Sequence, residues 1–164
     1  MADDFTFPVD LTAIMLFASS LGEENPIYYD QAHAEKTALG HVTAPPSFAI
    51  ASAHWNPNYP LRGIRQIPAR KAVADPPPKV AKRGDSGALA RGLHGEQRFE
   101  YHQPMRPGML LQVTTRPGKR WERQGKRGGT MQFSETISEY RDDAGELGVT
   151  ATSVGIVTSQ AVEG

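Results

Sequence analysis

The sequence predicts a single α+β domain in which helices come first and an antiparallel sheet follows. Up to about residue 55, apolar residues recur at the spacing of helices, and from about residue 94 onward they alternate as in β-strands. The length of 164 residues suits one domain with a proper core, so residues 1–164 are expected to fold as one unit. Helices followed by a run of strands are typical of α+β domains.

Two short helices are expected near the start of the chain. Asp10 is placed to cap a helix over residues 11–21, and Gly22 can adopt the left-handed conformation that ends it. Within this helix the apolar residues at helical spacing are Leu11, Ile14, Met15, Ala18 and Leu21. Asp30 is placed in the same way to cap a helix over residues 31–39, which a glycine follows.

A third helix is expected over residues 47–55. Pro45 and Pro46 precede it, and proline suits the first turn of a helix because the amide donors there have no partner within the helix. The stretch that follows is apolar on almost all sides, which predicts a buried helix. His54 lies within it, and we expect a buried neutral histidine, with a role in lining a channel as the alternative.

A basic, proline-rich loop is expected at about residues 60–92. Residues 62–91 contain eight lysines and arginines against two aspartates, a local net charge of +6, with three consecutive prolines at 76–78. A loop of this length inside a compact domain is typical either of a functional segment or of disorder.

The last part of the chain alternates as strands joined by turns. Turns are predicted at residues 106–108 and at residues 142–145. The alternating residues are Gln97, Phe99 and Tyr101, then Met109, Leu111 and Val113, then Met131, Phe133 and Ile137, and finally Leu147, Val149 and Ala151. Together they predict an antiparallel sheet.

Composition excludes several classes of function. Acidic and basic residues are balanced at 18 each, so no attraction to nucleic acid or anionic membranes is expected from the chain as a whole. The chain has no cysteine, which excludes disulfides, thiolate metal sites and a cysteine nucleophile. No signal peptide is expected, because the residues after Met1 contain no basic n-region and no apolar run of signal-peptide length, and no stretch approaches the roughly 20 apolar residues of a spanning helix. We therefore expect a soluble, cytoplasmic protein that binds no nucleic acid, membrane, metal or cofactor.

Three separated blocks of sequence carry a family resemblance. They are Gly22 to Asp30, which reads GEENPIYYD, Ala44 to Phe48, which reads APPSF, and Leu93 to Pro104, which reads LHGEQRFEYHQP. In this order they resemble the MaoC-like hydratase/dehydratase family, and most specifically its subgroup of MaoC dehydratase N-terminal or fungal-synthase-type dehydratase domains. The resemblance implies a hot-dog fold, in which an antiparallel sheet wraps around a buried central helix.

The resemblance also implies which residues to examine for chemistry. Family members add water across a 2-enoyl thioester with an Asp and a His that activate the water and a helix N-terminal amide that polarises the carbonyl. At these positions this chain has Glu23, Tyr28 and Pro46. Tyrosine, with an ordinary pKa of about 10, is a poor base at neutral pH, and proline has no N–H to donate. Glutamate keeps a carboxylate but is longer than aspartate by one methylene.

The expected function is that of one subunit of an enoyl-CoA hydratase or 3-hydroxyacyl-thioester dehydratase in lipid or steroid acyl-CoA catabolism. Because the catalytic positions are altered, we expect the non-catalytic, substrate-channel subunit, paired with a second MaoC-like chain that carries the intact Asp and His. Two alternatives stay open. One is a self-sufficient homodimeric hydratase that uses Glu23 and Tyr28, and the other is a non-enzymatic acyl-CoA-binding protein.

The residues expected to bind the acyl-CoA or acyl-carrier thioester come from the resemblance and from the basic loop. A basic rim can bind the phosphates of CoA because charge-assisted hydrogen bonds are stronger than neutral ones. The expected substrate-binding residues are Asn25, Pro46, Ser47, Phe48, His54, Arg70, Lys71, Lys82 and Arg83.

Overall fold

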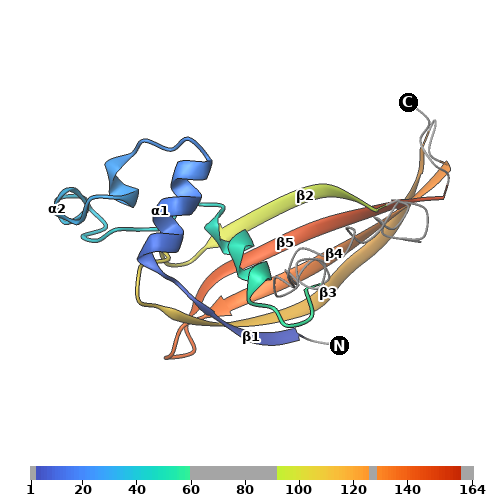
Figure 1. The fold of residues 1–164 in the computed structure, drawn as a ribbon. Coiled ribbons are helices and arrows are strands. Elements are labelled where there is room, and N and C mark those ends of the chain that lie inside the picture. Colours follow the sequence, from blue (N-terminus) through green and yellow to red (C-terminus); the bar gives the residue numbers. More distant parts are fainter. Residues whose placement is uncertain (1–2, 60–91, 126–128, 160–164) are drawn as a thin grey trace, which may run out of the picture.

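A computed structural model describes residues 3–59, 92–125 and 129–159 of the chain. Five strands form one antiparallel sheet, in the order β1-β3-β4-β5-β2, so β1 and β2 lie at its two edges (Figure 1). The strands are β1 Asp3–Pro8, β2 Gly92–Tyr101, β3 Leu110–Gly125, β4 Gly129–Arg141 and β5 Leu147–Thr158. Figure 1 shows most of the helical segments gathered at one end of the sheet, with the long strands extending away from them. The predicted α+β class and antiparallel sheet are confirmed.

The first predicted helix is confirmed as α1, Leu11–Ser20. An oxygen of the Asp10 carboxylate accepts a hydrogen bond from the Ala13 amide at 3.0 Å, which caps the first turn. Beyond the helix Gly22 has a φ of 71°, a left-handed conformation that glycine adopts without steric cost. Both ends of this helix therefore follow from local sequence.

The second helix is shorter than predicted, because α2 spans Gln31–Ala34 and does not continue to residue 39. Asp30 caps its start as expected, accepting a hydrogen bond from the His33 amide at 3.1 Å. The Thr37 hydroxyl donates to the Ala34 carbonyl at 2.7 Å. A threonine side chain bonded in this way competes with the helical backbone ladder, which accounts for the early end.

The third helix lies against one face of the sheet as the 3-10 helix η2, Phe48–His54 (Figure 1). Its sheet side is buried through Phe48, Ala49 and Ser52, whereas the side chain of Ile50 on the other side is 49% exposed. The sequence of this segment is apolar on almost all sides, but packing within the single chain buries only one of them.

The core lies between η2, α1 and one face of the sheet. Phe48 is its centre, with its ring centroid 5.6 Å from that of Phe7 and 5.4 Å from that of Phe17. Phe7 belongs to β1, a strand that the sequence analysis did not predict, and it is paired with Leu111 of β3. Alternation of apolar residues over so few positions is a weak signal, and β1 owes its strand structure to pairing with β3.

Two faces of the sheet have different character. Tyr140 of β4 is buried in the core, so the odd-numbered residues of β4, including Phe133, point to the opposite face, called here the outer face.

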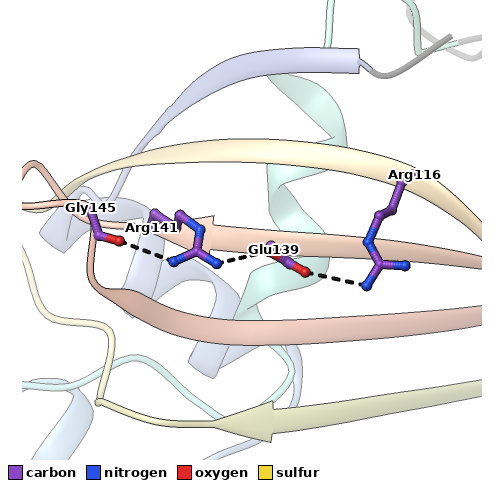
Figure 2. A network of polar contacts seen from close by, with 4 residues as sticks. All are labelled: Arg116, Glu139, Arg141 and Gly145. Carbon is purple, nitrogen blue, oxygen red and sulfur yellow. Dashed lines mark hydrogen bonds and ion pairs between the residues drawn. The ribbon is translucent and has the colours of Figure 1, made fainter.

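Glu139 on the outer face forms ion pairs with two arginines, Arg116 at 3.4 Å and Arg141 at 3.0 Å (Figure 2). Arg141 also donates to the Gly145 carbonyl at 3.1 Å, which ties the predicted hairpin turn to the sheet. The arginine hydrogen bonds, led by that of Arg141, lower the pKa of Glu139.

Candidate functional site

A pocket of about 460 Å³ opens at the end of the sheet that carries most of the helices. It brings together three of the residues that the sequence singled out, Asn25, Tyr28 and Pro46. Apolar lining comes from Ile27, Leu39, Ala44, Pro104 and Met105, and further polar lining comes from Thr43, Tyr101, His102 and Gln103. Its volume falls within the range of small-molecule sites, about 300–1,000 Å³.

One wall of the pocket is the short 3-10 helix η1, Pro26–Tyr28, and local hydrogen bonds fix its position. The Asn25 side chain accepts a hydrogen bond from the Ile27 amide at 3.0 Å, and proline takes the first position of the helix. The Tyr29 hydroxyl donates to the Glu23 carbonyl at 2.6 Å, which folds the preceding segment back onto the helix. The asparagine is therefore mainly a capping residue that holds Tyr28 at the pocket.

A second part of the pocket lining joins two segments that are far apart in sequence. The Ala44 amide and the Thr43 hydroxyl both donate to the Met105 carbonyl, at 2.8 and 3.1 Å. Pro46 follows this anchored segment, is exposed at the pocket, and has no amide hydrogen. Pro46 therefore contributes no backbone hydrogen-bond donor to the pocket.

Tyr28 occupies the pocket as a protonated phenol. Burial raises its pKa above the ordinary value of 10.0, and the charges of Glu23 and then Tyr29 raise it further. A phenol in this environment donates a hydrogen bond at neutral pH and does not act as a base. Glu23 itself is exposed and does not line the pocket.

The end of β2 supplies pocket residues that were not among the expected site residues. Burial raises the pKa of Tyr101 to about 12, with a smaller effect of Tyr140, so this side chain is also a neutral donor. His102 and Gln103 follow it, and their amides both donate to the Gly148 carbonyl, at 2.8 and 3.2 Å. These residues lie in the third sequence block of the resemblance, Leu93 to Pro104, and this block is the sequence signal that points to them.

Other expected site residues lie away from this pocket. Ser47 is half-buried at the start of η2, and Phe48 is completely buried in the core. The expectation of a buried His54 is wrong, because its side chain is exposed and stacks edge-on against Tyr59 with ring centroids 5.6 Å apart. The basic loop with Arg70, Lys71, Lys82 and Arg83 lies outside the described residues.

Two negative findings concern only the part of the chain that the structure describes. Within residues 3–59, 92–125 and 129–159, no three His, Cys, Asp or Glu side chains come together in a way that could hold a metal ion. None of the helices in these ranges has the length and apolar character needed to cross a membrane.

Sequence comparison relates the chain to dehydratases. A family model described as "FAS1-like, dehydratase domain region" matches residues 2–151. A UPF0336 protein of Thermobifida fusca is 28% identical over 159 residues, which are 96% of this chain and 89% of that protein. A protein of Thermomonospora curvata named "Probable enoyl-CoA hydratase alpha subunit" is 25% identical over 146 residues, which are 85% of this chain but 42% of that longer protein.

Comparison with solved structures supports the same fold. The HadBC complex of Mycobacterium tuberculosis, a (3R)-hydroxyacyl-ACP dehydratase, matches with a TM-score of 0.66 at 20% identity, covering 95% of this chain and 94% of that one. A MaoC-like dehydratase of Rhodospirillum rubrum matches with a TM-score of 0.57 at 16% identity, covering 98% and 92%. The expected hot-dog fold is confirmed by these likenesses and by the antiparallel sheet with η2 on its face.

Proposed function

The chain belongs to the family of FAS1-like dehydratase domain regions and has the hot-dog fold of MaoC-like dehydratases, and on this basis we propose that it is the substrate-channel subunit of a heteromeric hydro-lyase. The reaction is hydration of a 2-enoyl-CoA or the reverse dehydration of a 3-hydroxyacyl thioester, as part of lipid or steroid acyl-CoA catabolism. The acid–base chemistry belongs to a second MaoC-like chain with the intact catalytic pair.

The observation that carries this proposal is the chemistry of the pocket positions that correspond to the catalytic ones. Hydration needs a base for the water, and Tyr28 is a phenol whose pKa is raised and not lowered. It also needs a donor for the enolate oxygen, and Pro46 has no N–H at that position. The Glu23 side chain is exposed and lies outside the pocket lining.

What remains in the pocket is suited to binding. Its lining is largely apolar, and the hydroxyls of Tyr28 and Tyr101 stay protonated at neutral pH. Protonated phenols can donate to a neutral carbonyl such as that of a thioester without accepting a proton from water. An apolar pocket with a few neutral donors is typical of a site that holds an acyl chain in place.

The heteromeric part of the proposal is supported by the relatives. The Thermomonospora curvata protein is named as an alpha subunit, and the Mycobacterium tuberculosis dehydratase is a complex named for two components. Apolar side chains left exposed on η2 and α1, such as Ile50 and Leu16, give this chain further surface that a partner could cover.

A second candidate function is supported by one feature. The imidazole of His102 lines the pocket, and histidine is the side chain most often used as a general base. A self-sufficient homodimeric hydratase could therefore use His102 in place of the altered pair. This candidate differs from the main proposal in requiring turnover by the chain on its own.

The test uses the active complex with an intact MaoC-like partner. Glu23→Gln and Tyr28→Phe are each expected to change turnover by less than tenfold, whereas loss of a working acid or base costs about 10²–10⁴-fold. His102→Asn distinguishes the second candidate. A loss of two or more orders of magnitude in any of the three variants, with assembly and substrate affinity preserved, contradicts the non-catalytic assignment.

A further inference from the structure

A second cavity of about 640 Å³ lies between η2 and the inner face of the sheet, the face that also carries Tyr140. We call it the inner groove. Phe99 and Ile50 contribute apolar walls, and the far part of its floor is polar. Its volume again falls in the range of small-molecule sites, about 300–1,000 Å³.

The polar part of the floor contains one row of three side chains on neighbouring strands. Gln97 of β2 is paired with Ser153 of β5, and Ser153 is paired with Thr136 of β4, so the three lie side by side on the inner face. Among the residues that the structure describes, none of these three side chains has a hydrogen-bond partner. The row therefore presents one amide and two hydroxyls that are not used by the fold.

Other polar side chains in the same groove already have hydrogen-bond partners within the chain. The hydroxyls of Thr115 and Ser138 bond to each other at 3.0 Å. The Tyr140 hydroxyl donates to the Ala49 carbonyl at 3.0 Å and lies 2.8 Å from the Ser52 hydroxyl. Those groups hold the sheet and η2 together, whereas Gln97, Ser153 and Thr136 can accept and donate to a ligand.

The described lining of the inner groove contains no charged side chain. The described residues of the lining therefore offer no ionic partner to a carboxylate, a phosphate or a cationic group. The chemistry of the row fits a neutral oxygen, namely a hydroxyl or a ketone, which can use both the amide and the hydroxyls.

The inner groove adjoins the pocket along β2. Tyr101 lines the pocket and Phe99, two residues earlier on the same face, lines the groove, with their ring centroids 6.2 Å apart. Pro46 lies at the pocket and Ala53 at the groove, and at about 2 Å per residue the intervening 3-10 segment spans roughly 14 Å. A thioester in the pocket can therefore extend its acyl tail along η2 into the groove.

We propose that the inner groove holds the distal part of the acyl chain, and that Gln97, Thr136 and Ser153 select tails that carry a hydroxyl or ketone oxygen. This inference rests on the proposed function, because it assigns a substrate class to the same subunit. It makes these three residues determinants of specificity and gives them no part in acid–base chemistry.

The test measures equilibrium binding by calorimetry, on the chain and on its complex, so it does not depend on turnover. The two probes are a saturated medium-chain acyl-CoA and the same acyl-CoA with a hydroxyl or keto group near the end of the chain. The unaltered protein is expected to bind the oxygenated probe about tenfold more tightly, as expected for hydrogen bonds to otherwise free groups. The triple variant Gln97→Leu, Thr136→Val and Ser153→Ala is expected to lose this preference while binding the saturated probe at least as well.

The matched control replaces the neighbouring bonded pair, with Thr115→Val and Ser138→Ala, and is expected to keep the preference. Gln97→Leu alone provides a milder variant if the triple one folds poorly, and it should reduce the preference in part. Equal affinity of the unaltered protein for both probes overturns the inference and leaves the proposed function standing. If neither probe binds to the chain or to the complex, the proposed function fails as well.

Discussion

The two phenols of the pocket show how single residues change the chemistry of a site. Tyr28 and Tyr101 both have pKa values raised mainly by burial, so both keep their protons well above neutral pH. The pocket therefore offers two neutral hydroxyl donors. Under the proposed function, Tyr28 takes the position of the family base, and phenols of this kind can bind a thioester carbonyl but do not activate water.

Tyr101 gives a direct test of this environment. Its pKa of about 12 exceeds the ordinary value of 10.0, so the native state keeps a proton that the unfolded chain loses first. The associated stability is fully present below pH 10 and is lost as the pH rises toward 12. Tyr101→Phe should remove a step near pH 12 from a tyrosinate absorbance titration and flatten the fall in stability over this range. A variant that keeps the full tyrosinate absorbance change near pH 12 would refute the assignment.

The residues of the site could be predicted only in part. Asn25, Tyr28 and Pro46 follow from two short sequence blocks, and the structure does bring them to one pocket. Tyr101 and His102 join them through the pairing of β2 with β5, which no local pattern reveals. His54 was misjudged because apolar neighbours in sequence do not tell which side of a helix faces the sheet.

At the scale of elements, one buried network attaches η2 to the sheet. The Tyr140 hydroxyl donates to the Ala49 carbonyl, and the Ser52 hydroxyl can donate to Tyr140. Burial raises the pKa of Tyr140, so the phenol remains a donor in this network. The helix η2, which forms one side of the inner groove, is therefore fixed by a few polar atoms inside an apolar core.

Removing this hydroxyl should be costly. Tyr140→Phe removes the buried partner of the Ser52 hydroxyl and one donor to the Ala49 carbonyl, and a buried group that loses its partner costs about 1–3 kcal/mol of the free energy of unfolding. Urea unfolding followed by circular dichroism measures this difference. Tyr101→Phe is the matched control, because its hydroxyl has no hydrogen bond among the described residues. Equal unfolding midpoints for the two variants would contradict the role of the network.

Elements were predictable where local signals act alone. The first helix has a capping aspartate and a terminal glycine, and it was placed correctly. The second ended early because the Thr37 side chain took the Ala34 carbonyl, and β1 was missed because its stability comes from β3. In both cases the structure depends on a contact that the spacing of apolar residues does not reveal.

At the scale of the whole molecule, the single chain exposes apolar side chains and a strand edge of the kind that partner chains cover. Among the strands that the structure describes, β2 lies at the edge of the sheet and pairs on one side with β5, and its Leu93 side chain is 56% exposed. On α1, Leu16 is 66% exposed. An unprotected strand edge combined with exposed apolar side chains invites pairing with another chain.

We therefore expect that the protein is never a stable monomer. Light scattering on dilute purified protein should report a dimer or larger assembly, with the same or a second MaoC-like chain as partner. Leu93→Lys, which places a charge beside the free edge, should shift the population toward smaller species. A sharp, soluble species near the chain mass of 17.9 kDa for the unaltered protein would count against this account.

The central claim is that this chain binds the thioester and that a partner carries out the acid–base chemistry. The most direct test measures hydration of a 2-enoyl-CoA by the purified chain, with and without an intact MaoC-like chain. The account predicts binding but no turnover above the uncatalysed rate for the chain alone, and activity once the complex forms. Turnover by the purified chain alone, lost on replacement of Tyr28 or His102, would contradict it.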